Sequence, residues 1–403
     1  MKVLMVTSDH QMIDRRIIQE AKTLIAAGHD VQLLAGFECE QNEVYEDCGI
    51  KIERFTYNWA DSRFNAISYA LNLGSNGWVF RKLSLLFKAW VKFCASLSSF
   101  EHFVLEQILK QSFDVLHVHD FPMLKVGVRA AKIRGVPLIY DAHEIYYAQA
   151  QLPVVIQKRY RRTEKKYIRF PDVVITVNPF IAQLMADRYR IKTPNVILNA
   201  GEVRDIIDKN RLRRDLGWSA DIKIVLYQGW ISDNRGLDIL VKASKYFNSN
   251  VRLVLIGYGS YLKDLKALVK CLGVDAKVCF FGGVPSENLH DLTASADLGV
   301  IPYFGVDDNN HYCSPNKLFE FIVAEIPCLA NDLPFLRSII EHYKMGQLVN
   351  LRNEYELAKA VNQLTSSPED LAILKEGTAL AKKDLNWTVE GEKLLNIYQK
   401  ILT

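Results

Sequence analysis

The chain lacks the features that mark secreted, membrane-spanning and zinc-binding proteins. Its seven cysteines include no CxxC pair and no recurring metal-ligand spacing, so we expect reduced thiols rather than disulfides. No apolar run approaches the ~18 residues of a membrane span. The first residues, MKVLMVTS, are typical of a strand rather than of a signal peptide. These absences together predict a cytoplasmic protein.

An excess of charge of either sign is also missing. The formal net charge of the 403 residues is only +4, so nothing in it indicates nucleic-acid binding. A hydrophobic content of 49% with 24% charged residues is typical of a folded globular protein. A chain of this length is too long for one ordinary core and fits two domains of about 200 residues each.

Short apolar, β-branched runs alternate with amphipathic helical stretches along the whole chain. Continuous apolar runs of this kind suit parallel sheets buried on both faces. The expected strands form two series, 2–8, 31–36, 114–120, 137–143, 172–178 and 194–200, then 223–229, 251–257, 277–283, 296–302, 327–332 and 346–350. They predict an α/β protein of two facing, doubly wound, Rossmann-like domains with a ligand cleft between them. We place these domains at residues 1–200 and 201–386, followed by a helix over 387–403 that could pack back on the first.

The segment SPNKLFEFIVAEIP at 314–327 carries the strongest site signal. Ser314 suits an N-cap and Pro315 a first helical position, so we predict a helix start there. The free N–H groups and the positive dipole end of such a helix suit a phosphate, with Lys317 as an added charge. Glu320 lies on the same helical face, where its carboxylate could accept hydrogen bonds from two ribose hydroxyls. The alternative is an amphipathic helix whose Lys317 and Glu320 face solvent.

Further turns follow predicted strands of the second half. In the turn 228–236, Gly229 allows the backbone to approach a ligand, and Arg235 can pair with phosphate oxygens. Gly257 and Gly259 form a bare GxG, a weak signal without a third glycine. The turn 282–285 offers backbone groups to a base edge.

Polar residues also gather at two strand ends of the first half. His117, His119 and Asp120 end one strand, and Asp141, His143 and Glu144 end another. Because strand side chains alternate, His117 and His119 share a face. The cluster suits acid–base work, sugar hydroxyls or a metal ion, or it is purely structural. Since no cysteine joins it and HxHD is a common pattern, we expect no metal.

Together these elements resemble glycosyltransferase family 4, retaining enzymes of the GT-B fold. The resemblance covers essentially the whole chain through ordered segments at 14–31, 172–178, 255–265, 278–289, 296–303 and 314–330. SPNKLFE is most similar to the branch that makes bacterial surface polysaccharides. The resemblance implies an acceptor-binding domain at 1–200 and a nucleotide-sugar-binding domain at 201–386.

The resemblance also implies roles for individual residues. It places Glu320 on the ribose and Lys317 on the diphosphate, with Arg235 where the family usually has a phosphate-binding lysine. His119 matches the active-site histidine that faces the donor sugar and acceptor. Implied donor contacts further include Gly229, Gly257, Gly259, Val284, Tyr312, Ser314, Pro315, Asn316 and Leu318. Implied acceptor contacts are His10, His119, Asp120, His143 and Glu144.

Some positions depart from the family pattern. Tyr312 stands where the family has the first glutamate of a Glu-x7-Glu motif, and Asp307 or Asp308 is a candidate replacement. Residues 9–12 replace a glycine-rich loop, Trp230 replaces a phosphate-binding arginine, and Glu325 replaces a helix-ending glycine. These departures concern contacts to the donor sugar more than binding of the nucleotide.

Two basic stretches of the first half suggest a membrane-facing surface. Residues 78–93 form a basic amphipathic helix with interfacial aromatics, and residues 158–169 carry seven basic residues with Glu164 as the only acid. They could dock on an anionic membrane that presents a lipid-linked acceptor. The alternative is helices that pack on the core with a solvated basic rim.

The predicted function is transfer of a sugar from a nucleoside diphosphate, UDP preferred, to an acceptor hydroxyl. The resemblance implies retention of the anomeric configuration by front-face attack, with neither a metal nor a cofactor. The expected partners are a nucleotide-sugar donor and a glycan or lipid-linked acceptor of cell-surface glycan synthesis. Two alternatives stay open, a GT-B sugar-nucleotide epimerase and a catalytically inactive partner subunit.

Overall fold

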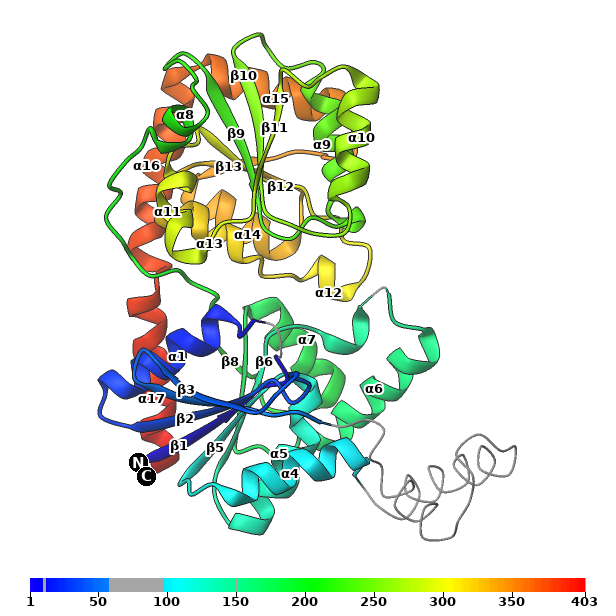
Figure 1. The fold of residues 1–403 in the computed structure, drawn as a ribbon, viewed down its shortest axis with the longest axis vertical. Helices are drawn as coiled ribbons and strands as arrows, with labels where there is room; N and C mark the ends of the chain where they lie inside the picture. Colours follow the sequence, from blue (N-terminus) through cyan, green and yellow to red (C-terminus); the bar gives the residue numbers. More distant parts are fainter. Residues whose placement is uncertain (10–11, 58–96, 150, 403) are drawn as a thin grey trace.

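The computed structural model describes residues 1–9, 12–57, 97–149 and 151–402, which form two α/β domains (Figure 1). The first has an eight-stranded sheet of order β3-β4-β2-β1-β5-β6-β7-β8, and the second a six-stranded sheet of order β11-β10-β9-β12-β13-β14. Every pairing in the two sheets is parallel except that of β3 with β4. Two Rossmann-like sheets confirm the predicted fold class.

The elements of the first domain alternate as expected for a doubly wound sheet. Its strands are β1 (Lys2–Val6), β2 (Asp30–Ala35), β3 (Glu43–Asp47), β4 (Ile50–Arg54), β5 (Val115–His119), β6 (Leu138–Ala142), β7 (Val173–Thr176) and β8 (Asn195–Val196). Its described helices are α1 (Arg15–Ala26), α4 (Ser99–Lys110), α5 (Asp120–Arg134), α6 (Val154–Tyr167) and α7 (Pro179–Tyr189), with a short 3₁₀ turn η1 (Tyr146–Ala148). Strands β5 and β6 are buried along their whole length, as their apolar runs predict.

The second domain repeats the alternation. Its strands are β9 (Lys223–Gln228), β10 (Val251–Ile256), β11 (Val278–Gly282), β12 (Leu298–Ile301), β13 (Cys328–Ala330) and β14 (Gly346–Leu348). Its helices are α8 (Arg211–Asp215), α9 (Leu237–Ser244), α10 (Leu262–Leu272), α11 (Ser286–Ala294), α12 (Asp308–His311), α13 (Asn316–Val323), α14 (Pro334–Tyr343), α15 (Glu354–Ser366) and α16 (Pro368–Asp384), with a 3₁₀ turn η2 (Asp233–Arg235).

The hairpin β3–β4 was not among the strands expected from the sequence. Strand β3 is largely exposed and carries three acidic residues in five, so it lacks the apolar run of a buried strand. The connection places Cys48 and Gly49 at φ 52° and 79°, the conformation that joins antiparallel strands through a two-residue turn. Local turn geometry, rather than a buried apolar run, therefore makes this edge.

The last helix, α17 (Trp387–Leu402), runs back along the first domain beside α1, and both chain ends lie close together (Figure 1). Trp387 donates its indole N–H to the hydroxyl of Thr23 at 2.9 Å. The hydroxyl of Tyr398 lies 2.8 Å from Nδ1 of His117. Trp387, Leu394 and Tyr398 are buried in the core on that face of the sheet. The C-terminal helix thus links the two domains.

Within the described residues, no helix combines the length and apolar character needed to cross a bilayer.

Candidate active site between the domains

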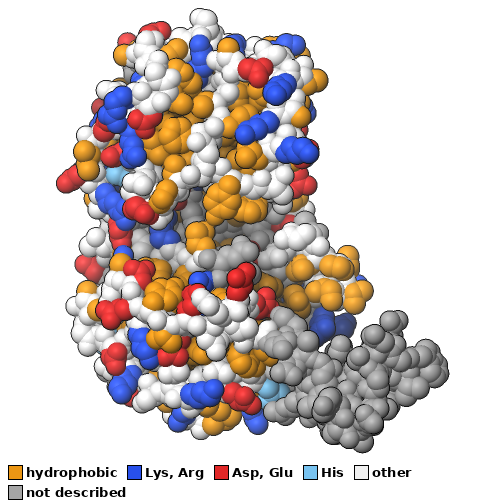
Figure 2. All heavy atoms as spheres, in the orientation of Figure 1, with side chains coloured by type: hydrophobic (Ala, Val, Ile, Leu, Met, Phe, Trp, Pro, Cys, Tyr) orange, Lys and Arg blue, Asp and Glu red, His pale blue; other side chains and the backbone are white. Residues whose placement is uncertain are grey.

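Polar side chains from both domains meet where the surface is drawn in between them (Figure 2). Glu144, Asn178 and Asn199 each follow a strand of the first sheet, at the edge where doubly wound sheets bind ligands. Hydrogen bonds across the junction include those of Arg15 with Glu320, Glu144 with Asn309, Asn178 with the carbonyl of Tyr312, Arg188 with Asp308, and Asn199 with the carbonyl of Ser314. The junction therefore joins five residues that the sequence singled out to five that it did not. The first five are Glu144, Asp308, Tyr312, Ser314 and Glu320, and the others are Arg15, Asn178, Arg188, Asn199 and Asn309.

The helix expected at Ser314 starts one residue later than predicted. Pro315 has extended backbone, φ −71° and ψ 128°, and is itself the N-cap, so α13 begins at Asn316 rather than at Pro315. The hydroxyl of Ser314 is buried without a hydrogen-bond partner and does not cap the helix. Because no side chain caps this end, the N–H groups of Asn316 and Lys317 remain available to an anion.

Lys317 is buried, with only 4% of its surface exposed. Its Nζ lies 3.7 Å from the centre of the Tyr227 ring and 4.5 Å from that of Tyr303, and it has no hydrogen-bond partner. Burial, and then the positive charge of Arg235, hold the pKa of Lys317 well below its usual value. The solvent-facing alternative for Lys317 is therefore wrong.

Arg235 reaches the same aromatic ring. Its guanidinium carbon lies 4.0 Å from the centre of the Tyr303 ring, and its Nε is buried without a partner. Neither Arg235 nor Lys317 makes an ion pair in the described part of the chain. A Cβ on Gly229 would lie 3.7 Å from Nζ of Lys317, so this turn brings backbone next to the two cations. Two basic side chains on one ring, beside an uncapped helix start, make this a candidate anion site.

Glu320 is held from both sides. Its Oε1 accepts from Nη1 of Arg15 at 3.2 Å, and its Oε2 accepts from the side-chain amide of Gln228. Gln228 is itself fixed, since its Oε1 accepts from the hydroxyl of Thr293 at 2.8 Å. The Glu320 side chain is 19% exposed, so its remaining lone pairs can accept hydrogen bonds from a pair of hydroxyls.

Gly257 and Gly259 have a packing role in this structure. A Cβ at Gly257 would lie 1.9 Å from the carbonyl oxygen of Gly229, and one at Gly259 would lie 2.0 Å from that of Ile231. The N–H of Gly229 bonds Ile256, and that of Ile231 bonds Tyr258. The two glycines therefore let the turns after β9 and β10 lie against each other. Val284 is half-buried at the start of the loop before α11.

The first-domain cluster is organised by Arg16, which the sequence reading did not single out. Its Nη2 bonds both oxygens of Asp141, at 2.7 and 3.0 Å, and its Nε bonds Glu20 at 2.8 Å. Its Nη1 bonds the carbonyl of Ile197 and the side chain of Asn199. Arg16 and Glu20 are buried on the same face of α1 as Ile17, Ala21 and Leu24. A charged pair with i,i+4 spacing on an otherwise apolar helix face is the sequence signal that could have identified Arg16.

The histidines of the cluster differ in exposure and charge. His117 and His119 are fully buried, so neither opens onto the cleft surface, whereas His143 is partly exposed. Burial lowers the pKa of His117 to about 4 and holds that of His119 well below its usual value. Burial opposes the charge of His143 as well, but Asp120 and Asp141 raise its pKa well above the usual value. His143 is therefore the charged histidine of the cluster.

Two contacts join this charged histidine to its neighbours. Nε2 of His143 lies 3.3 Å from Nδ1 of His119 and 3.5 Å from Asp141. The carboxylate of Asp120 accepts from the backbone N–H of His143 at 3.0 Å, and burial raises the pKa of Asp120 to about 7. Asp120 also has a φ of 61°, a conformation rare outside glycine and frequent at functional sites. His119 is thus linked to the cleft through His143.

A group of possible metal ligands lies behind these residues. Ligand atoms of Glu20, His117, His119 and Asp141 lie within 4.8 Å of one another. Arg16 already donates hydrogen bonds to both carboxylates and supplies their compensating charge. We therefore assign no metal to this group.

Other residues expected at the site have identified partners or lie outside the description. Asp307 caps α12 through the N–H of Asn310, and Asp308 pairs with Arg188 at 3.0 Å. The ring of Tyr312 packs on the core of the first domain. Leu318 is buried in the core of the second domain. His10 and residues 78–93 lie outside the described residues.

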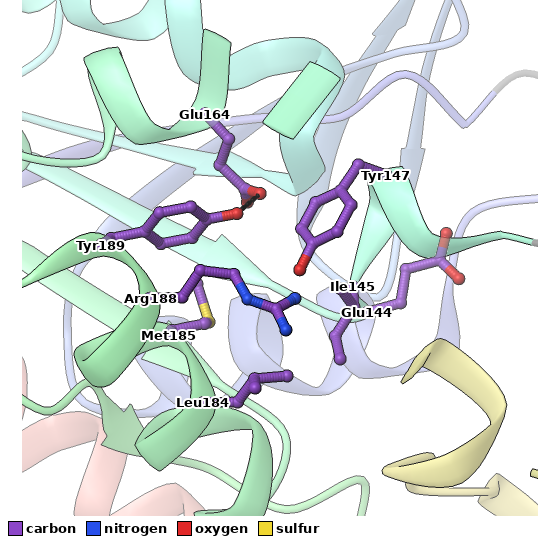
Figure 3. Close-up of a pocket in the computed structure, with 8 residues that line it drawn as sticks. All are labelled: Glu144, Ile145, Tyr147, Glu164, Leu184, Met185, Arg188 and Tyr189. Carbon is purple, nitrogen blue, oxygen red and sulfur yellow. Dashed lines mark hydrogen bonds between the residues drawn. The ribbon is translucent and has the colours of Figure 1, made fainter. Parts of the chain in front are cut away.

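A small cavity lies behind the cleft wall, lined by Glu144, Ile145, Tyr147, Glu164, Leu184, Met185, Arg188 and Tyr189 (Figure 3). At about 10 Å³ it has room for roughly one water molecule. Buried Glu164 accepts from the hydroxyls of Tyr189 and Tyr140, and burial raises its pKa. This cavity supports the fold and does not hold a substrate.

Comparisons with known proteins cover nearly the whole chain. Residues 13–200 match the family model described as Glycosyltransferase Family 4, and residues 208–380 match the model described as Glycosyl transferases group 1. The chain is 25% identical, over 272 residues, to the putative glycosyltransferase EpsD of Bacillus subtilis, across 64% of this chain and 68% of that protein.

Solved structures share the fold at low sequence identity. Anabaena HepE, crystallised with UDP, superposes with a TM-score of 0.73 at 18% identity, across 99% of this chain and 100% of that one. WaaG, a glycosyltransferase involved in lipopolysaccharide biosynthesis, superposes with a TM-score of 0.66 at 14% identity, across 98% and 99% of the two chains. These likenesses confirm the expected GT-B fold.

Proposed function

We propose that this chain, a GT-B glycosyltransferase made of a family 4 domain and a group 1 domain, is a retaining enzyme that uses a nucleoside-diphosphate sugar, UDP preferred. Its acceptor is a hydroxyl of a lipid-linked or polysaccharide glycan in cell-surface glycan synthesis. The observation that carries the proposal is the pair Lys317 and Arg235, two cations without anionic partners beside the uncapped start of α13. The relatives named above, one crystallised with UDP and one involved in lipopolysaccharide synthesis, support the choice of donor and pathway class.

The proposed chemistry follows from where charge develops. The bond from the anomeric carbon to the diphosphate breaks, the acceptor oxygen bonds the same face of that carbon, and the hydroxyl proton passes to the departing diphosphate. Lys317, Arg235 and the N–H groups of Asn316 and Lys317 stabilise the charge on this leaving group. Because protein cations serve that purpose, we propose that transfer needs no metal.

Glu320 would bind the ribose, and the first-domain cluster would bind the acceptor. Charged His143 and Asp120 are the members that reach the cleft, and both can hold sugar hydroxyls. The buried His119 would act through His143, which lies 3.3 Å from it.

The acceptor proposal includes docking on an anionic membrane through residues 158–169. No acidic partner pairs with Lys158 or Arg161 in the described chain, and Val154 and Val155 at the start of α6 are 62% and 77% exposed. Hydrophobic side chains gather at this projecting end (Figure 2). Co-sedimentation with liposomes should increase with their anionic lipid content. Co-sedimentation that does not depend on this content would contradict membrane docking.

Nucleotide binding tests the central proposal. Calorimetric titration with UDP, GDP, ADP and CMP should reveal one preferred nucleotide. Lys317→Ala and Glu320→Ala should each lower turnover by roughly 10²–10³-fold, since both act on the donor. Near-normal turnover in both variants would refute the assignment. A changed sugar nucleotide formed without acceptor would instead indicate the epimerase.

A further inference from the structure

The nucleotide-binding helix α13 is contacted by a residue of the opposite domain. Arg15, the first residue of α1, donates from Nη1 to Oε1 of Glu320 at 3.2 Å. The Arg15 side chain is 34% exposed, so it lies at the cleft surface rather than in a core. The Glu320 carboxylate, which is proposed to bind the ribose, thus accepts one hydrogen bond from its own domain, from Gln228, and one from the other domain, from Arg15.

The position of Arg15 is fixed by the start of α1. Asp14 is the N-cap, and its carboxylate accepts from the N–H of Arg16 at 2.8 Å. The N–H of Asp14 donates in turn to the carboxylate of Asp9 at 2.9 Å. The next residue, Arg16, is anchored in the buried network with Asp141 and Glu20. Arg15 therefore projects from a rigid element, which makes its contact with Glu320 directional.

A second connection runs from the next residue of α1, Arg16, to Ser314, just before the same helix. Arg16 donates to the side-chain oxygen of Asn199 at 3.1 Å, and the amide of Asn199 donates to the carbonyl of Ser314 at 3.2 Å. Ser314 immediately precedes the N-cap of α13. The first turn of α13 is thus held at two points, and only the Arg15 contact lies on a side chain that would touch the nucleotide.

From this geometry we infer that Arg15 is a positioning residue of the donor site. It orients the carboxylate of Glu320, which is proposed to bind the ribose, only when the two domains face each other. The inference rests on the proposed function. With one oxygen held by Gln228 and the other by Arg15, Glu320 presents its free lone pairs in one orientation to the ribose diol. Nucleotide binding and closure of the cleft then favour each other, because each needs the same carboxylate orientation.

Calorimetric titration with UDP tests this role. Arg15→Ala should weaken UDP binding by about three- to tenfold. Arg15→Lys should retain part of the affinity, because lysine keeps the positive charge but lacks the planar guanidinium donors. The double variant Arg15→Ala/Glu320→Gln should bind no more weakly than Glu320→Gln alone, because Arg15 acts only through Glu320. Arg214→Ala, which breaks an exposed pair with Asp208 at α8, on the side of the second domain away from the first (Figure 1), is the matched control and should leave affinity unchanged.

The outcomes separate this inference from the proposed function. If the wild type binds UDP and Arg15→Ala binds it equally well, Arg15 has no positioning role while the donor site stands. If the wild type binds none of UDP, GDP, ADP and CMP, the proposed function itself fails. Scattering adds a second readout, since UDP should contract the wild type more than Arg15→Ala, and equal contraction would contradict the coupling.

Discussion

The guanidinium of Arg16 bonds both carboxylate oxygens of Asp141, at 2.7 and 3.0 Å, with both side chains buried. This pair joins α1 to the strand that carries the cluster residues Asp141 and His143. A bidentate pair of this kind fixes direction as well as distance. The part of the cleft beside His143 therefore depends on the buried Arg16.

Breaking this pair should destabilise the protein strongly. Arg16→Met removes the bidentate partner of buried Asp141 and the ion-pair partner of buried Glu20, so the free energy of unfolding should fall by about 3–5 kcal/mol. Urea denaturation followed by circular dichroism measures the loss. Arg15→Met is the matched control and should cost about 1 kcal/mol or less, because its ion pair is partly solvated. Equal stabilities of the two variants would contradict the buried role of Arg16.

Sequence patterns predicted the architecture because parallel strands buried on both faces appear in the sequence as continuous apolar runs. The apolar runs at β5, β6, β9 and β10 are the buried strands of the two sheets. The edge hairpin β3–β4 escaped prediction because turn geometry rather than burial makes it.

The candidate site was predicted in part. The segment around Lys317 and Glu320 was identified because a helix start with a cation and a carboxylate follows from local spacing. Arg16 was missed because its partners Asp141 and Asn199 are distant in sequence and meet it only in the fold. The burial of His119 likewise involves its neighbours His117 and His143, which strand alternation alone does not place around it.

Asp120 should make stability depend on pH. Its pKa is about 7 in the folded protein, raised first by burial, against 3.8 for the unfolded chain. Between these values the folded state binds the proton more tightly, so the stability that Asp120 confers is lost as pH rises towards 7. Asp120→Asn removes this dependence and should gain stability relative to the wild type from pH 4.5 to 7.5, as thermal unfolding would show. The exposed control Asp275→Asn should follow the wild type, and parallel curves for all three proteins would contradict the shift.

Gly257 should be intolerant of any side chain. Its φ is 146°, and an added Cβ would meet the carbonyl oxygen of Gly229 at 1.9 Å, so Gly257→Ala must move the turn that lies beside Lys317. We expect a loss of about 1–3 kcal/mol of stability together with weaker UDP binding, measured by thermal unfolding and calorimetry. Gly273→Ala is the control, because its φ is also positive while no atom lies within 4 Å of the added Cβ. It should lose stability through backbone strain but keep UDP affinity, and loss of affinity in both variants would point to general unfolding.

Replacement of Lys317 should stabilise the fold but abolish UDP binding. Its amino group is buried between Tyr227 and Tyr303 and makes no hydrogen bond to any described residue, so Lys317→Met removes a desolvated polar group while filling the same space. The melting temperature should rise, by the equivalent of about 1 kcal/mol or more, while UDP binding is lost. The exposed control Lys375→Met should change neither property.

The same residue should link UDP binding to proton uptake. Burial and Arg235 depress the pKa of Lys317, and a bound diphosphate would raise it again. The wild type should therefore take up protons when it binds UDP, so that its binding enthalpy varies with the ionisation enthalpy of the buffer. An enthalpy that is the same in phosphate and Tris buffers would show that Lys317 is already charged before the nucleotide arrives, and its burial would then need an anion supplied by the protein itself.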